Sequence, residues 1–65
     1  MQVLTWQARH DKKVTLVELS AKTGISKSAL NNIENGKVSP TISQLERIAM
    51  ALDVKISDLY ESDYK

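Results

Sequence analysis

The segment GISKSALNNIENGK, residues 24–37, predicts a short helix with an outer face of small polar side chains. We expect this helix to run from about Lys27 to Asn35. Ser26 is a favoured N-cap residue, because its hydroxyl can accept a hydrogen bond from the first turn. Gly36 follows as a typical helix stop signal, since glycine adopts the left-handed conformation that ends many helices.

The two sides of this helix differ in chemistry. At about 100° per residue, Leu30 and Ile33 lie on the inner side. The outer side carries amide and hydroxyl groups, with an amine at its N-terminal end: Ser28, Asn31, Asn32, Asn35 and Lys27. An Asn side chain donates and accepts in one plane, which suits the edge of adenine in a DNA major groove. Taken alone, this helix is equally compatible with an ordinary solvated surface.

Similar helix signals occur on both sides of this segment. Capping-box patterns start at Thr15 and Thr41, in TLVE and TISQ. They predict a second helix over residues 16–23, ended by Gly24 in a positive-φ turn, and a fourth helix reaching Leu52. A first helix is expected over residues 2–12 and a short last one over residues 56–60, capped by Ser57. No segment has strand alternation, so the fold class is all-α, with four or five short helices.

Composition limits the classes of function. The 65 residues suffice for one domain, so residues 1–65 are expected to form a single unit. The chain has no Cys and one His, His10, so no metal site is expected. It has no apolar run long enough for a membrane span and no signal-peptide pattern, which predicts a cytoplasmic protein with no membrane contact. In the absence of nucleotide-binding or nucleophile motifs, neither a cofactor nor enzymatic activity is expected.

Charge is distributed unevenly along the chain. Residues 1–37 contain six Lys or Arg and three acidic residues, whereas residues 38–65 contain three and five. This difference indicates that the N-terminal part faces a polyanion. Chance scatter of charges over a solvated surface is the alternative.

Two short helices joined by a Gly-containing turn, the second with a polar face, form a helix-turn-helix. The sequence TLVELSAKTGISKSALNNIENGKVSPTISQLERIAMALDV, residues 15–54, resembles the Cro/C1-type (XRE family) helix-turn-helix of phage repressors and their bacterial relatives. The resemblance covers roughly residues 4–60. It implies a compact, lambda-repressor-like bundle of five short helices, in which helices two and three form the motif.

The resemblance also implies a function and a set of contacts. It implies a transcriptional regulator, and in particular a repressor, that binds double-stranded operator DNA and occludes a promoter. The base-contacting residues would be Lys27, Ser28 and Asn32, with Asn31 at the edge. The phosphate contacts would come from three segments at the border of the motif: Thr15 and Leu16, Asn35 and Lys37, and Ser39, Thr41 and Ser43. A homodimer on a palindromic operator is expected, with contacts near Leu59, Tyr60 and Tyr64 at the C-terminal end.

Arg9 and Glu34 match a pair that the family commonly ties between helices one and three. The helical wheel independently turns Glu34 inward, where a carboxylate needs a partner. We therefore assign this ion pair a structural role.

The sequence departs from the family pattern in helix two and just before it. Leu16 stands where the family often has a phosphate-binding Gln, which puts a side-chain phosphate contact there in doubt. Ser20 replaces the usual inward Ala, and Lys13 replaces the usual Gly before the helix.

A second class of function stays open. Related folds also serve as adaptor or antitoxin-type modules, whose main role is to bind a protein partner. The Lys27, Ser28, Asn32 face and its flanking lysines favour DNA over that alternative. Trp6 is expected to pack against neighbours of the first helix, with partial exposure at a partner surface as the alternative, and Met50 is expected in the core.

Overall fold

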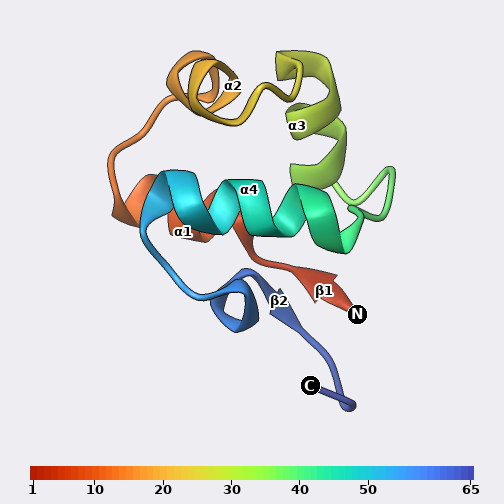
Figure 1. The fold of residues 1–65 in the computed structure, drawn as a ribbon. Helices are drawn as coiled ribbons and strands as arrows, with labels where there is room; N and C mark the ends of the chain where they lie inside the picture. The colour runs from red at the N-terminus through yellow and green to blue at the C-terminus, as the bar shows by residue number, and fades with distance from the viewer.

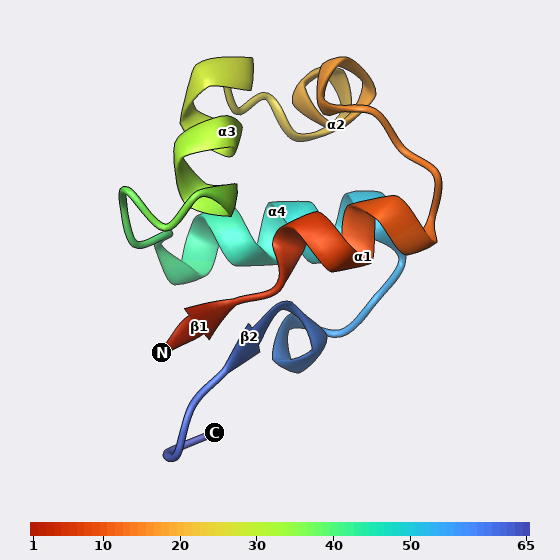
Figure 2. The same cartoon turned by 180° about the vertical axis from the view of Figure 1, so that it is seen from behind.

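The computed structural model describes all 65 residues, as four α-helices, one 3-10 helix and a two-stranded antiparallel sheet. Helices α1 and α4 lie side by side across the middle of the molecule, with α2 and α3 on one side and the sheet on the other (Figures 1 and 2). In chain order the elements are β1 (Gln2–Val3), α1 (Thr5–Asp11), α2 (Leu16–Thr23), α3 (Lys27–Glu34), α4 (Ile42–Leu52), η1 (Ile56–Leu59) and β2 (Tyr60–Glu61).

The core forms where α2, α3 and α4 meet η1. Helix α4 contributes four buried side chains at helical spacing: Leu45, Ile48, Ala49 and Leu52. Leu19 of α2, Leu30 of α3 and Leu59 of η1 join them in one cluster. Both helices of the helix-turn-helix bury a leucine in this cluster, where α2 packs on α4 while α3 packs mainly on α2 and α1.

The helix starts follow the predicted N-caps. The hydroxyls of Thr15, Ser26 and Thr41 each accept a hydrogen bond from the backbone N–H three residues on, at 3.0 to 3.1 Å. At Thr41 the capping box is complete, since the Gln44 side chain accepts from the Thr41 N–H. At Thr15 the box takes another form, because the Glu18 carboxylate accepts from the Thr15 hydroxyl instead.

The helix ends use the left-handed conformation in four places. Gly24 and Gly36 have φ of 73° and 74°, so the expected positive-φ turn at Gly24 is confirmed. Lys13 and Asp53 adopt φ of 56° and 55° although neither is glycine. After α1, the Lys13 N–H donates to His10 O and the Val14 N–H to Arg9 O, which is a Schellman ending.

The two ends of the chain differ from the prediction. Residues Gln2–Val3 pair antiparallel with Tyr60–Glu61, so the first helix does not start at Gln2 and the content is not purely helical. The Leu4 N–H extends this pairing by donating to Leu59 O at 2.8 Å. A strand of two residues is too short for alternation to be recognised in the sequence.

The predicted count of five helices is also too high. The last one is a 3-10 helix of four residues, and its first turn is closed by Asp58, which accepts from the Lys55 N–H, and not by Ser57. The structure therefore has four α-helices and one short 3-10 turn. No helix reaches the length and apolarity that crossing a membrane requires.

Three side chains lie where the sequence did not place them. Met50 is 77% exposed, so its assignment to the core is wrong. Trp6 is 47% exposed and stacks on His10 of its own helix, with ring centroids 3.7 Å apart, so it is only partly packed, and the alternative of partial exposure describes it better. Leu59 is fully buried in the core, which removes it from the expected dimer contact.

Candidate nucleic-acid interface

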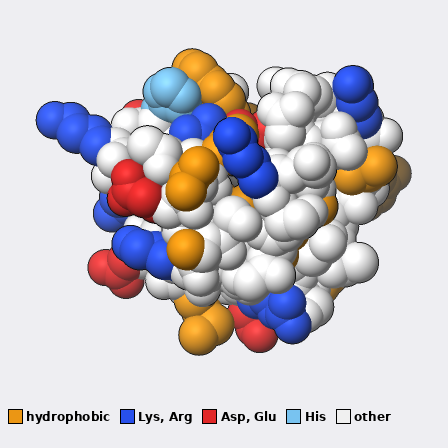
Figure 3. Space-filling view, turned by 90° about the horizontal axis from the view of Figure 1, so that it is seen from above, with side chains coloured by type: hydrophobic (Ala, Val, Ile, Leu, Met, Phe, Trp, Pro, Cys, Tyr) orange, Lys and Arg blue, Asp and Glu red, His pale blue; other side chains and the backbone are white.

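Helix α3 presents the polar face that its sequence predicted. Leu30 and Ile33 are each 1% exposed and anchor the helix from within. On the opposite side four candidate base-contacting or flanking side chains are exposed and one, Asn32, is partly buried: Lys27, Ser28, Asn31, Asn35 and Asn32. Seen from above in Figure 3, the surface over α3 is mostly uncharged, with Lys or Arg at its margin. This face offers amide, hydroxyl and amine groups for hydrogen bonding.

The candidate phosphate contacts gather at three chain segments around α3. They are the start of α2 (Thr15, Leu16), the turn after α3 (Asn35, Lys37) and the approach to α4 (Ser39, Thr41, Ser43). Apart from Leu16, all of these residues are exposed. The starts of α2 and α4 also carry backbone N–H groups without an intrahelical acceptor, which favour a phosphate together with the helix dipole.

The two capping threonines differ in what they can donate. The Thr41 hydroxyl accepts from the Gln44 N–H, which leaves its own proton free for a phosphate oxygen. The Thr15 hydroxyl donates its proton to the Glu18 carboxylate, whose negative charge also disfavours a nearby phosphate. Thr41 is therefore the better side-chain donor. The sequence alone did not distinguish them, because both begin a capping-box pattern.

Leu16 has a packing role. Its side chain is partly buried and packs against the core cluster. Neighbouring Val17 is 62% exposed and leaves an apolar spot at the start of α2.

Arg9 and Glu34 are brought together across the interface between α1 and α3. Arg9 Nε donates to Glu34 Oε2 at 2.8 Å and a terminal Arg9 nitrogen donates to Oε1 at 3.1 Å. The other terminal nitrogen donates to Val14 O at 3.0 Å, in the loop before α2. One guanidinium thus joins α1, the end of α3 and the loop that leads into α2, and so fixes the frame around the polar face.

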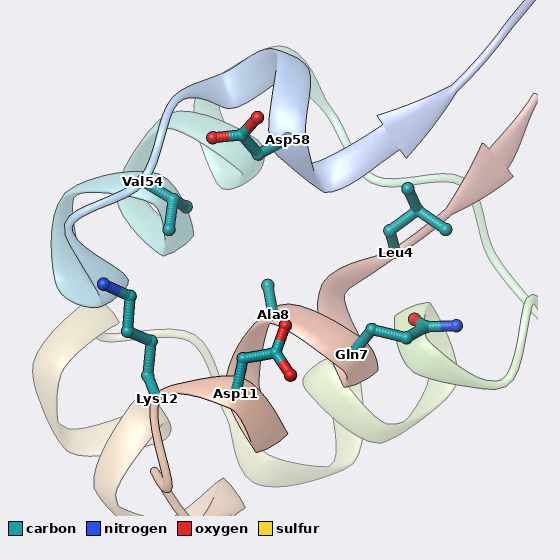
Figure 4. Close-up of a pocket in the computed structure, with 7 residues that line it drawn as sticks. All are labelled: Leu4, Gln7, Ala8, Asp11, Lys12, Val54 and Asp58. Carbon is teal, nitrogen blue, oxygen red and sulfur yellow. The ribbon is translucent and has the colours of Figure 1, made fainter.

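A hollow of about 390 Å³ lies apart from the α3 face (Figure 4). Its seven lining residues come from α1 and its flanks, from the segment after α4, and from η1: Leu4, Gln7, Ala8, Asp11, Lys12, Val54 and Asp58. None of them belongs to α2 or α3. The structure contains no group of three or more His, Cys, Asp or Glu side chains arranged to hold a metal ion.

Comparisons with known proteins agree with this geometry. A family model described as helix-turn-helix matches residues 7–59. The chain is 37% identical over 60 residues to the HTH-type transcriptional regulator SinR of Bacillus subtilis (strain 168), which is 91% of this chain and 54% of that protein. It is 39% identical over 49 residues to the immunity repressor protein of Bacillus phage phi105, which is 75% of this chain and 34% of that protein.

Among solved structures, the N-terminal DNA binding domain of SinR from Bacillus subtilis matches this fold with a TM-score of 0.80. The match has 34% sequence identity and covers 94% of this chain and 90% of that one. The chain therefore matches nearly all of that domain, but only about half or less of the length of the two curated relatives.

Proposed function

The chain belongs to the Cro/C1-type helix-turn-helix family, and we propose that it is a sequence-specific DNA-binding transcriptional regulator. The observation that carries the proposal is the exposed polar face of α3, supported from beneath by buried Leu30 and Ile33. The proposed binding unit is one domain of residues 1–65. No catalytic step and no cofactor enters this proposal.

The proposed base contacts lie on α3. Lys27 and Ser28 enter the major groove first, and Asn32 follows one turn later, with Asn31 at the edge. Bidentate hydrogen bonding from Asn to adenine and from Lys to guanine would give these contacts their sequence preference. The partial burial of Asn32 supports this role, because a side chain with fewer conformations loses less entropy when it binds.

The proposed phosphate contacts set the orientation of the domain on DNA. Lys37 carries the positive charge after α3 and takes part in no ion pair. Thr41, with its free hydroxyl proton, and the exposed Ser39 and Ser43 flank the start of α4. Such contacts position a protein on the duplex without reading sequence.

A single domain of this size makes few base contacts, so we propose that two copies bind a two-fold symmetric operator. Half-sites about one helical turn apart would suit this arrangement. Of the residues expected at the dimer contact, Tyr64 is 98% exposed and Tyr60 is partly exposed, whereas Leu59 belongs to the core. The proposed consequence of binding is repression, by covering a promoter.

Selection from a random duplex DNA pool tests the proposal. We expect enrichment of a two-fold symmetric site, binding by two copies of the chain in analytical ultracentrifugation, and an affinity that falls steeply with salt. If no site is enriched and salt has no effect on binding, DNA recognition is excluded for this chain. Enrichment of a single asymmetric half-site bound by one copy would support sequence-specific DNA binding and exclude the proposed dimer.

A protein-binding role, of the adaptor or antitoxin type, is the second candidate. The observation that favours it is the hollow of about 390 Å³ beside α1, whose lining combines Leu4, Ala8 and Val54 with two carboxylates and Lys12. A partner seated there would leave the α3 face free. Failure to select DNA, together with a stable complex that shields the Ala8 and Val54 signals in an NMR spectrum, would favour this candidate instead.

A further inference from the structure

Ile25 occupies the turn between α2 and α3 and is held there by burial in the core and by two hydrogen bonds to α2. Its side chain is 7% exposed and belongs to the core cluster. Its N–H donates to Thr23 Oγ1 at 3.2 Å, and its carbonyl accepts from the Ser20 hydroxyl at 2.7 Å. Both backbone polar groups of this one residue are therefore bonded to hydroxyls of the preceding helix.

The two hydroxyls behave differently. Thr23 donates to Leu19 O at 2.7 Å, four residues back, which is the usual local bond of a hydroxyl residue inside a helix. Ser20 instead reaches forward, out of its own helix, to a residue in the turn. The Ser20 carbonyl accepts from the Gly24 N–H at 2.9 Å, so Ser20 holds the turn through its backbone and its side chain.

The position of Ile25 connects this turn to the polar face. Ser26, the N-cap of α3, follows it directly, and Lys27 and Ser28 come next. A change in the path of the chain at Ile25 therefore displaces the N-terminal turn of α3 relative to α2. The hydroxyl bond is not what makes Ser20 helical, because Ser20 lies inside α2, whose backbone hydrogen bonds form without its side chain.

We propose that Ser20 is a positioning residue for base recognition, acting through its hydrogen bond to Ile25 O. The bond fixes the angle between α2 and the start of α3. At this angle Lys27 and Ser28 contact the bases and the phosphate contacts form at the same time. This inference rests on the proposed DNA-binding function. The proposed effect is on specificity, because the non-specific phosphate contacts tolerate a small rotation of α3 better than base contacts do.

The test compares wild type, Ser20→Ala and the matched control Ser57→Ala, whose serine is exposed and has no side-chain hydrogen bond. For each, affinity is measured for the selected duplex and for a scrambled duplex. In Ser20→Ala the ratio of the affinity for the selected duplex to that for the scrambled duplex should fall about two- to tenfold, the range expected for losing one hydrogen bond. The affinity for the scrambled duplex and its salt dependence should not change. Ser57→Ala should match wild type. Ser20→Cys, which keeps a side chain of similar size with a weak donor, should give an affinity ratio between those of wild type and Ser20→Ala.

Residual dipolar couplings of the free proteins give a second readout. We expect the angle between α2 and α3 to change in Ser20→Ala and to stay constant in Ser57→Ala. An unchanged ratio, or an equal loss of affinity for both duplexes, would overturn the positioning role, and so would an unchanged angle. If wild type itself shows no preference for any duplex, the proposed function fails, and that result is distinct because it does not depend on the variant.

Discussion

The guanidinium of Arg9 in α1 donates two hydrogen bonds, of 2.8 and 3.1 Å, to the carboxylate of Glu34 in α3, which lies 25 residues further along the chain. The side chains are 11% and 4% exposed. A pair so little exposed has lost most of its hydration, so each charge depends on the other. The remaining Arg9 bond, to Val14 O, extends the link to the segment before α2.

Glu34→Gln should destabilise the fold by about 3 kcal/mol or more, because it leaves the Arg9 charge shielded from water without its counter-ion. Urea unfolding followed by circular dichroism measures this loss. Glu61→Gln is the control. The Glu61 side chain is 62% exposed, its Oε2 lies 3.8 Å from Lys65 Nζ, and such an exposed ion pair contributes about 0 to 1 kcal/mol to stability. An unchanged unfolding midpoint in Glu34→Gln would contradict the structural role of the pair.

Lys13→Gly should stabilise the protein by roughly 0.5 to 1 kcal/mol. Lys13 has φ of 56°, a conformation that costs a side-chain-bearing residue about 1 kcal/mol or more and glycine almost nothing. The greater freedom of glycine in the unfolded chain offsets part of the gain. Thermal unfolding measures the effect. Asp53→Gly, at φ of 55°, should give a smaller gain, because Asp tolerates this region better than Lys. A lower melting temperature in Lys13→Gly would show that the left-handed backbone at this position is not strained by its side chain.

Thr5→Val should stabilise the protein by about 1 kcal/mol. The Thr5 side chain is 1% exposed and its hydroxyl has no hydrogen-bond partner, so valine of similar shape removes an unsatisfied polar group. Thr23→Val is the opposite case, because the buried Thr23 hydroxyl bonds both Leu19 O and the Ile25 N–H, and it should destabilise by about 1 to 2 kcal/mol. Chemical denaturation compares the two, and equal signs would refute the assignment of the hydroxyl bonds.

Lys37→Ala should weaken binding to all duplexes alike. A lysine that contacts a phosphate contributes counterion release, so its removal should reduce the slope of log affinity against log salt by about 1 per chain. Fluorescence anisotropy at several salt concentrations measures the slope. Lys55→Ala, in the exposed segment between α4 and η1, serves as the control and should leave the slope unchanged. A change in sequence preference without a change in slope would assign Lys37 to base contact instead.

Local sequence signals predicted the middle of the chain well. The caps at Thr15, Ser26 and Thr41 and the glycines at 24 and 36 gave α2 its observed bounds and α3 its bounds to within one residue. These signals work because each depends on hydrogen bonds or backbone conformations within a few residues of itself. Angular position on the helix accounts for the exposure of Met50, which lies about 200° from the buried Ile48 although its residue type favours the core.

Long-range contacts explain the rest. The strand pairing of Gln2–Val3 with Tyr60–Glu61 joins segments that carry no local strand signal, and the burial of Leu59 follows from the same closure of the chain ends. Within the candidate interface, the sequence did not reveal two hydrogen bonds: the Ser20 hydroxyl donates to Ile25 O, and the Thr15 hydroxyl donates to the Glu18 carboxylate. Each of these bonds depends on a side-chain direction that only the folded chain sets.

The most direct test of base reading by α3 is selection from one random duplex pool, carried out in parallel with wild type and with Asn32→Ala. We predict the same two-fold symmetric site for both, with one symmetric pair of positions losing its preference in the variant, at a cost of about 1 to 3 kcal/mol per chain in discrimination. Identical preferences at every position, despite tight binding by both proteins, would contradict the claim that Asn32 on the outer face of α3 reads the sequence.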